Sequence, residues 1–146
     1  MIMNMEKITH IEKFDTPIDF STEIKVDDTE IMYHNTFEIG QGGPVVGNIS
    51  INGIFIPNHY FGGPSLFDEQ YLYIPIYMKK IISWRFKLAR INFNSLTVDA
   101  IGKWESVIFL EKIENGTIFF YEDVGKTHSK YYKLSEFESK KNLIIN

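Results

Sequence analysis

Two Asn-Gly pairs constrain the fold of this chain more than any other feature of its sequence. Asn52-Gly53 lies between the runs 45–51 and 54–56, and Asn115-Gly116 lies between 106–113 and 117–121. Asparagine and glycine both tolerate the positive φ angles that a two-residue hairpin turn demands. Each pair therefore predicts two antiparallel strands joined by a tight turn.

Residues 71–78 alternate in the manner of a strand. Leu72, Ile74, Ile76 and Met78 share one parity, and tyrosines fill most of the other. Because successive strand residues point to opposite faces, we expect the aliphatic set to face a core. Pro75 lies on the tyrosine parity and has no N–H to donate to a neighbouring strand. It predicts a strand at a sheet edge, or one that carries a bulge.

A second alternating run, residues 84–93, changes parity in its middle. Its apolar positions are even-numbered up to Leu88 and odd-numbered from Ile91 onwards. A slip of one residue would turn the core face outward, so we expect a β-bulge at Ala89-Arg90. The side chains expected in the core are Leu72, Ile74, Ile76, Trp84, Phe86, Leu88, Ile108 and Leu110.

Helical signals are few. Ser65 to Asp68 and Ser135 to Glu138 each fit a capping pattern, which predicts short helical turns near 65–70 and 135–141. Two alanines against 12 Phe and 8 Tyr form a composition that favours sheets. With further strands expected in 22–39 and 96–101, the sequence predicts a single β-rich domain over residues 1–146. It would be mainly β, with antiparallel sheets arranged as a sandwich, a meander or an open barrel.

The chain contains no cysteine, which excludes disulfides and thiolate chemistry and is typical of a reducing compartment. Its first 14 residues show no basic segment followed by an apolar one. No run approaches the ~20 apolar residues of a membrane-spanning helix. We therefore expect a cytoplasmic protein that has no membrane partner.

Charge is distributed unevenly along the sequence. Residues 1–38 hold nine acids and three lysines, whereas residues 79–103 hold six bases and one acid. Two interpretations stay open: solvated faces of ordinary strands, or an acidic face that attracts a basic partner. The net charge of −4 argues against a nucleic-acid partner, because nucleic-acid binding requires a basic surface.

No sequence motif brings catalytic or metal-binding groups together. The four histidines lack the i+2 and i+4 spacings of metal sites. The glycine-rich residues 40–47 and Gly125-Lys126-Thr127 lack the other positions of a phosphate-binding loop. No serine lies in a G-x-S-x-G turn. We expect no metal, no cofactor and no catalytic residues, and therefore no enzyme.

Aromatic residues gather around a loop rich in glycine and proline, residues 57–64. Large aromatic side chains anchor many protein interfaces, although they can equally pack inside a second sheet. If they are exposed, the expected partner-binding residues are Tyr60, Phe61, Tyr71 and Tyr73 as anchors, with Asp68 and Glu69 as nearby acids.

Residues 37–77 contain four features in order: Phe37-Glu38-Ile39 before a Gly/Pro turn, the hairpin over 47–53, Phe61-Gly62-Gly63-Pro64, and Tyr71-Leu72-Tyr73-Ile74-Pro75. In these features the segment resembles the small immunity proteins encoded beside bacterial polymorphic toxins. The resemblance implies a cytoplasmic protein that binds and blocks a toxin domain made by the same cell. It carries over no catalytic residues.

Three hypotheses about function stay open. The first is an immunity protein, or another protein that binds a protein partner. The second is a β-domain that holds a small molecule or a carbohydrate in an aromatic pocket. The third is an enzyme whose carboxylates lie far apart in the chain, as in glycosidases. The sequence leaves the oligomeric state open.

Overall fold

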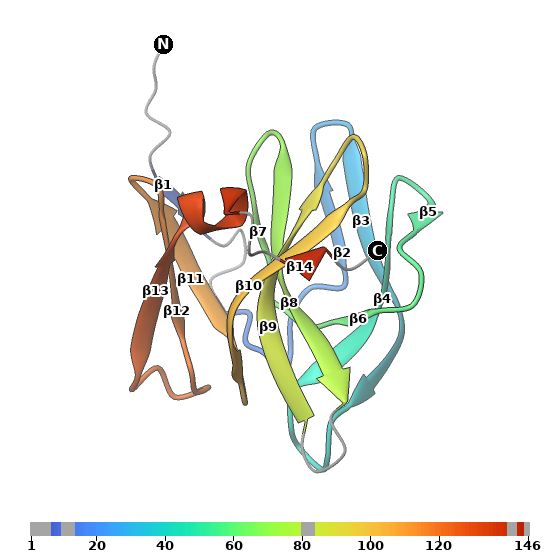
Figure 1. Cartoon of the computed structure of the whole chain (residues 1–146). Helices are drawn as coiled ribbons and strands as arrows, with labels where there is room; N and C mark the ends of the chain where they lie inside the picture. Colours follow the sequence, from blue (N-terminus) through green and yellow to red (C-terminus); the bar gives the residue numbers. More distant parts are fainter. Residues whose placement is uncertain (1–6, 10–13, 80–83, 140–142, 145–146) are drawn as a thin grey trace.

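The computed structural model describes residues 7–9, 14–79, 84–139 and 143–144 (Figure 1). In these residues the chain forms 14 strands and one 3-10 turn, and every strand pairing is antiparallel. The predicted mainly β, antiparallel fold class is confirmed. No helix within these ranges has the length and apolar character that crossing a bilayer requires.

The strands form two sheets. The smaller sheet has the order β1 (Lys7–Thr9), β11 (Phe109–Glu114), β12 (Thr117–Tyr121) and β13 (Ser129–Lys133). The larger sheet has the order β14 (Leu143–Ile144), β10 (Val98–Glu105), β9 (Trp84–Asn92), β8 (Tyr71–Lys79), β6 (Tyr60–Phe61), β4 (Val45–Ile51), β3 (Thr29–Glu38) and β2 (Glu23–Val26). Two short strands lie off this path: β5 (Ile54–Phe55) pairs with β4, and β7 (Leu66–Phe67) pairs with β8.

The larger sheet curls around a first hydrophobic core. Ile31 of β3 and Ile49 of β4 belong to the same buried cluster as Leu72 and Ile74 of β8 and Ile91 of β9. Strands from opposite ends of one sheet share a core only if the sheet bends back on itself. Its concave face therefore encloses this core, and its convex face points outward (Figure 1).

A second hydrophobic core lies between the convex face of β8–β10 and the smaller sheet. Phe86 and Leu88 of β9 pack with Leu110 of β11 and Phe120 of β12. Arg90 lies within the same interface, where its guanidinium stacks between aromatic rings. The two sheets are therefore stacked, and the central strands are buried on both faces. All predicted core residues are buried, except that the side chain of Trp84 lies outside the described residues.

The prediction for Pro75 is wrong, because β8 is an interior strand with an unbroken register along β9. On its other side β8 pairs with β6 near Ile76 and with β7 near Tyr73, and Pro75 falls between the two. The Gly62 N–H donates to the Pro75 carbonyl at 2.9 Å. The position where proline lacks an N–H thus faces the gap between β6 and β7, where no strand residue needs a hydrogen-bond donor.

The predicted bulge at Ala89-Arg90 is also wrong. The pairing of β9 with β8 runs without a shift, and the irregularity between β9 and β10 lies instead between Ile101 and Glu105. The apolar positions change parity because β9 faces two cores: Leu88 lies in the second and Ile91 in the first. A parity change in the sequence therefore marks a strand buried on both faces here.

The two expected helical turns differ in outcome. Residues 65–70 form no helix, because Leu66 and Phe67 pair with β8 and the Asp68 carboxylate caps a turn. Near the C-terminus, the 3-10 turn η1 (Leu134–Glu138) begins one residue before Ser135. The Lys133 N–H donates to the Glu136 carboxylate at 3.4 Å, so Lys133 occupies the capping position expected for Ser135. Residues 140–141 lie outside the described residues.

Both Asn-Gly hairpins are present. All four turn residues have positive φ, and the flanking strands pair across each turn. Residues 22–39, expected as strand, form a hairpin of β2 and β3 that turns at Asp27-Asp28. Strand β10 begins later than expected and extends to Glu105, and strand β13 had no counterpart in the prediction.

Candidate partner-binding surfaces

The six predicted partner-binding residues lie in two separate places. Tyr60 pairs with Tyr77 near one end of β8, whereas Tyr71 begins the strand at its other end. At roughly 3.3 Å per strand residue, about 20 Å of strand separates the two positions. The four aromatic side chains therefore do not form one patch.

Tyr60 is exposed and Phe61 is buried, because adjacent strand residues point to opposite faces. Tyr60 keeps 41% of its surface exposed and meets the ring of Phe37 edge-on at 5.2 Å between centroids. Phe61 has 0% exposure and belongs to the first core. Its burial removes Phe61 from the candidate anchors.

Tyr73 and Tyr71 face the second core. Tyr73 is buried beside Phe137, and its hydroxyl donates to the Asp68 carboxylate at 3.4 Å. Burial and then the charge of Asp68 raise the pKa of Tyr73 above its usual range. Tyr71 is half-buried, with the guanidinium of Arg90 4.1 Å from its ring centroid. Both rings are thus engaged within the molecule.

Asp68 and Glu69 lie at the rim of an open cavity of about 250 Å³. Asp27 and Asp28, from the β2–β3 turn, line the same cavity, so two acidic turns that are distant in the sequence meet there. The cavity is lined by Val26, Asp27, Asp28, Thr29, Ile31, Phe67, Asp68, Glu69 and Phe93. Four carboxylates therefore surround an apolar floor with no basic side chain among the lining residues.

The backbone holds part of this rim rigidly. The Asp68 carboxylate accepts the N–H groups of Gln70 at 2.8 Å and Tyr71 at 2.7 Å. This turn fixes the entry of the chain into β8. Glu69 is exposed, so its charge is directed to solvent. Within the described ranges, no three His, Asp or Glu side chains meet in a way that would hold a metal ion.

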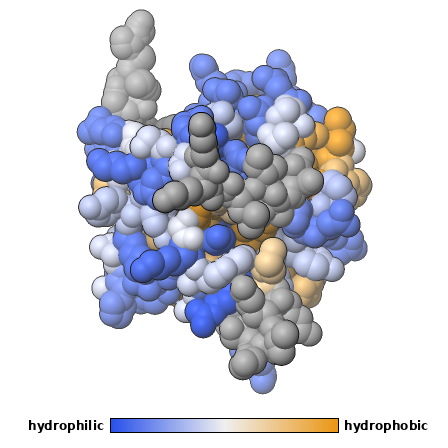
Figure 2. Space-filling model, viewed as in Figure 1, coloured by the Kyte–Doolittle hydropathy of each residue, from blue (hydrophilic) through white to orange (hydrophobic). Residues whose placement is uncertain are grey.

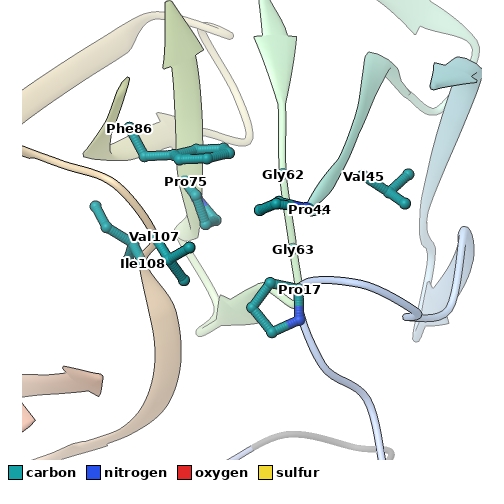
Figure 3. Close-up of a pocket in the computed structure, with 9 residues that line it drawn as sticks. All are labelled: Pro17, Pro44, Val45, Gly62, Gly63, Pro75, Phe86, Val107 and Ile108. Atoms are coloured by element: carbon teal, nitrogen blue, oxygen red, sulfur yellow. The ribbon is translucent and has the colours of Figure 1, made fainter. Parts of the chain in front are cut away.

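A second crevice, at the junction of the two cores, is apolar. Figure 3 shows Val107 and Ile108 approaching it from one side, and Pro44 and Val45 from the other. It is too narrow to admit a water molecule, and only glycine, proline and apolar residues line it. This crevice offers no group for chemistry or for polar recognition.

An exposed aromatic surface, which sequence reasoning missed, lies on the convex side of β3, β4, β5 and β6. We define this aromatic face by His34, Phe37, Phe55 and Tyr60. His34 and Phe55 are 4.6 Å apart between ring centroids, beside the Phe37–Tyr60 pair. Figure 2 shows the apolar surface at the edge formed by the β4–β5 hairpin. The sequence of β3 mixes apolar and polar residues on both parities. It therefore does not show which of them are exposed until β3 is placed in the curled sheet.

No protein-family model, no curated protein and no solved structure matches this chain. Function is therefore inferred from the surface chemistry of the chain itself.

Proposed function

We propose that this chain is a non-catalytic protein that binds a protein partner, and specifically a cytoplasmic immunity protein that blocks a cognate bacterial toxin domain. One observation carries the proposal. No lysine or arginine occurs between Lys25 and Lys79, a stretch that holds Asp27, Asp28, Glu30, Glu38, Asp68 and Glu69. This stretch forms strands β3 to β8, so this part of the chain carries six acids and contributes no lysine or arginine of its own.

Such a surface favours a basic partner. Uncompensated acids steer a positively charged surface toward them and speed association, most strongly at low salt. The four carboxylates of the cavity rim add a concave feature that a projecting lysine or arginine could enter. The resemblance of residues 37–77 to toxin immunity proteins supports the same class of partner.

The test co-expresses the chain with the product of the adjacent gene. We expect that product to be toxic alone, and the chain to bind it and restore growth. The triple variant D27N/D28N/E69Q should slow association by several-fold to tenfold and flatten its salt dependence. The matched control E111Q/E114Q removes two acids from the smaller sheet and should leave association unchanged. A toxic product that the chain neither binds nor neutralises would sink the proposal.

A small cationic ligand is the second candidate, and the cavity favours it. Its volume of about 250 Å³ is close to the lower end of known ligand sites, and its floor is apolar. Titration calorimetry with spermidine as the probe separates the two functions. Saturable binding abolished by D27N/D28N, without any partner protein, would favour the ligand-binding β-domain.

A further inference from the structure

We propose that the aromatic face is the docking surface for a basic protein, whose arginine or lysine side chains stack on its rings. This inference rests on the proposed function and deepens it, because it assigns the surface and the chemistry of the partner. The acidic cavity steers the partner, whereas the aromatic face would hold it.

The aromatic face is a part of the larger sheet that no described element covers. Phe37, Phe55 and Tyr60 keep 41%, 55% and 41% of their surfaces exposed. In contrast, the smaller sheet covers the convex face of β8–β10. Exposed aromatic pairs left open on a folded domain are typical of an interaction site.

The rings of the aromatic face are held in place before any partner arrives. They project from paired strands, and the His34 imidazole nitrogen Nε2 lies 2.8 Å from the Ser50 hydroxyl. The two ring pairs, at 4.6 Å and 5.2 Å, restrict one another further. Side chains that are already ordered lose little entropy on binding, which suits them to be anchors.

The positions of the chain's own lysine and arginine side chains indicate what kind of partner the aromatic face would bind. In the described chain, the rings that bear a lysine or arginine lie elsewhere: Lys112 lies over Phe119, Lys126 over Phe109, Lys87 over Trp104, and Arg90 over Tyr71 and Phe137. Among the described side chains, no such contact covers Phe37, Phe55 or Tyr60, and the stretch between Lys25 and Lys79 that carries them contains no lysine or arginine. The negative faces of these rings are thus open to cations from another molecule.

Charge also selects among other occupants. A nucleic acid would bring phosphates to strands β3 to β6, which contain acids and no lysine or arginine, and this disfavours binding. A second copy would place two acidic stretches against each other, which costs energy through like-charge repulsion. A basic protein surface meets both the acids and the open rings.

The first experiment titrates the isotope-labelled protein with a hexa-arginine peptide and follows aromatic resonances by NMR. We expect shifts at Phe37, Phe55 and Tyr60 that weaken with salt, and none at Tyr131, which is 60% exposed on the smaller sheet. A hexa-glutamate peptide should cause no shifts. The proposal is overturned if the peptide shifts no resonances, shifts Tyr131 equally, or acts only on the cavity residues.

The second experiment uses the adjacent gene product and the variants F55A/Y60A and Y131A. Truncating two anchors should speed dissociation at least tenfold, whereas Y131A should have no effect. If the wild-type chain binds and F55A/Y60A binds equally well, the aromatic face is wrong and the proposed function stands. If the wild-type chain does not bind but hexa-arginine still shifts the face, the proposed function falls and the basic-surface assignment stands. A dimer in analytical ultracentrifugation that F55A/Y60A dissociates would assign the face to a second copy and overturn the inference.

Discussion

At the scale of single residues, Phe86 shows how much the second core contributes to stability. Its ring is 2% exposed and lies 5.4 Å from that of Tyr77. Phe86→Ala removes the buried ring and leaves a cavity, so we expect a loss of about 3–5 kcal/mol in the free energy of unfolding. Urea denaturation measures it, with Tyr131→Ala as an exposed aromatic control that should cost little. A loss below about 1 kcal/mol would contradict the packing described here.

Arg90 lies in the second core, although no pattern in the sequence predicts a buried position for it. Its guanidinium lies between the rings of Tyr71 and Phe137, and it pairs with Asp99 at 3.5 Å and Glu138 at 2.9 Å. Lysine lacks the planar fork that makes these contacts together, so Arg90→Lys should cost about 1–3 kcal/mol. Because Phe137 and Glu138 belong to η1, hydrogen exchange should quicken in η1 more than in β12. An equal increase of the exchange rate in η1 and β12 would show that Arg90 does not stabilise the turn.

At the scale of elements, the sequence predicted strands and tight turns well, because their signals are local. The Asn-Gly hairpins and the strand from Tyr71 follow from alternation and turn chemistry alone. The prediction at Pro75 failed because the missing N–H meets a gap between β6 and β7 and not a sheet edge. The prediction at Ala89-Arg90 failed because it assumed a strand with one buried face. A second core makes both parities apolar, and only the packing of the two sheets reveals it.

Two glycines at bends separate local strain from packing. Gly116 has φ of 74° with open space around its α-carbon, so Gly116→Ala should cost about 1–2 kcal/mol from backbone strain alone. Gly102, in the irregular part of β10, has φ of 85°, and a Cβ there would overlap the ring of Tyr132. Gly102→Ala should therefore cost roughly 2–5 kcal/mol. Thermal and urea unfolding of the two variants provide the comparison, and equal losses would contradict the tight contact with Tyr132.

At the scale of the whole molecule, the candidate site was predictable in its chemistry and not in its geometry. The sequence shows acids without bases, and it singled out Asp68 and Glu69. It does not show that the curled sheet brings Asp27 and Asp28 to the same cavity, because that contact joins turns about 40 residues apart. Tyr60 and Phe61 were predicted together, yet strand parity sends one outward and the other into the core.

Three buried tyrosines, Tyr33, Tyr73 and Tyr77, make the stability of the whole fold sensitive to alkali. Burial raises the pKa of Tyr33 and Tyr73 far above the usual range, and raises that of Tyr77 to about 12. In the unfolded chain these hydroxyls return to a pKa near about 10, so above that pH the unfolded state loses protons that the folded state retains. The free energy of unfolding should be fully present below about pH 10 and should fall as pH rises beyond it.

Tyr33→Phe tests this argument, because it removes one of these titrating groups. Its hydroxyl donates to the Gly62 carbonyl at 2.6 Å, so the variant should lose about 1 kcal/mol at neutral pH. Between about pH 10 and pH 11, however, its free energy of unfolding should decline less steeply than that of the wild type. Urea denaturation across this range, with tyrosinate absorbance recorded alongside, measures both slopes. Parallel declines in the two proteins would mean that Tyr33 is not held protonated by the fold, and would place the origin of alkaline unfolding in other groups.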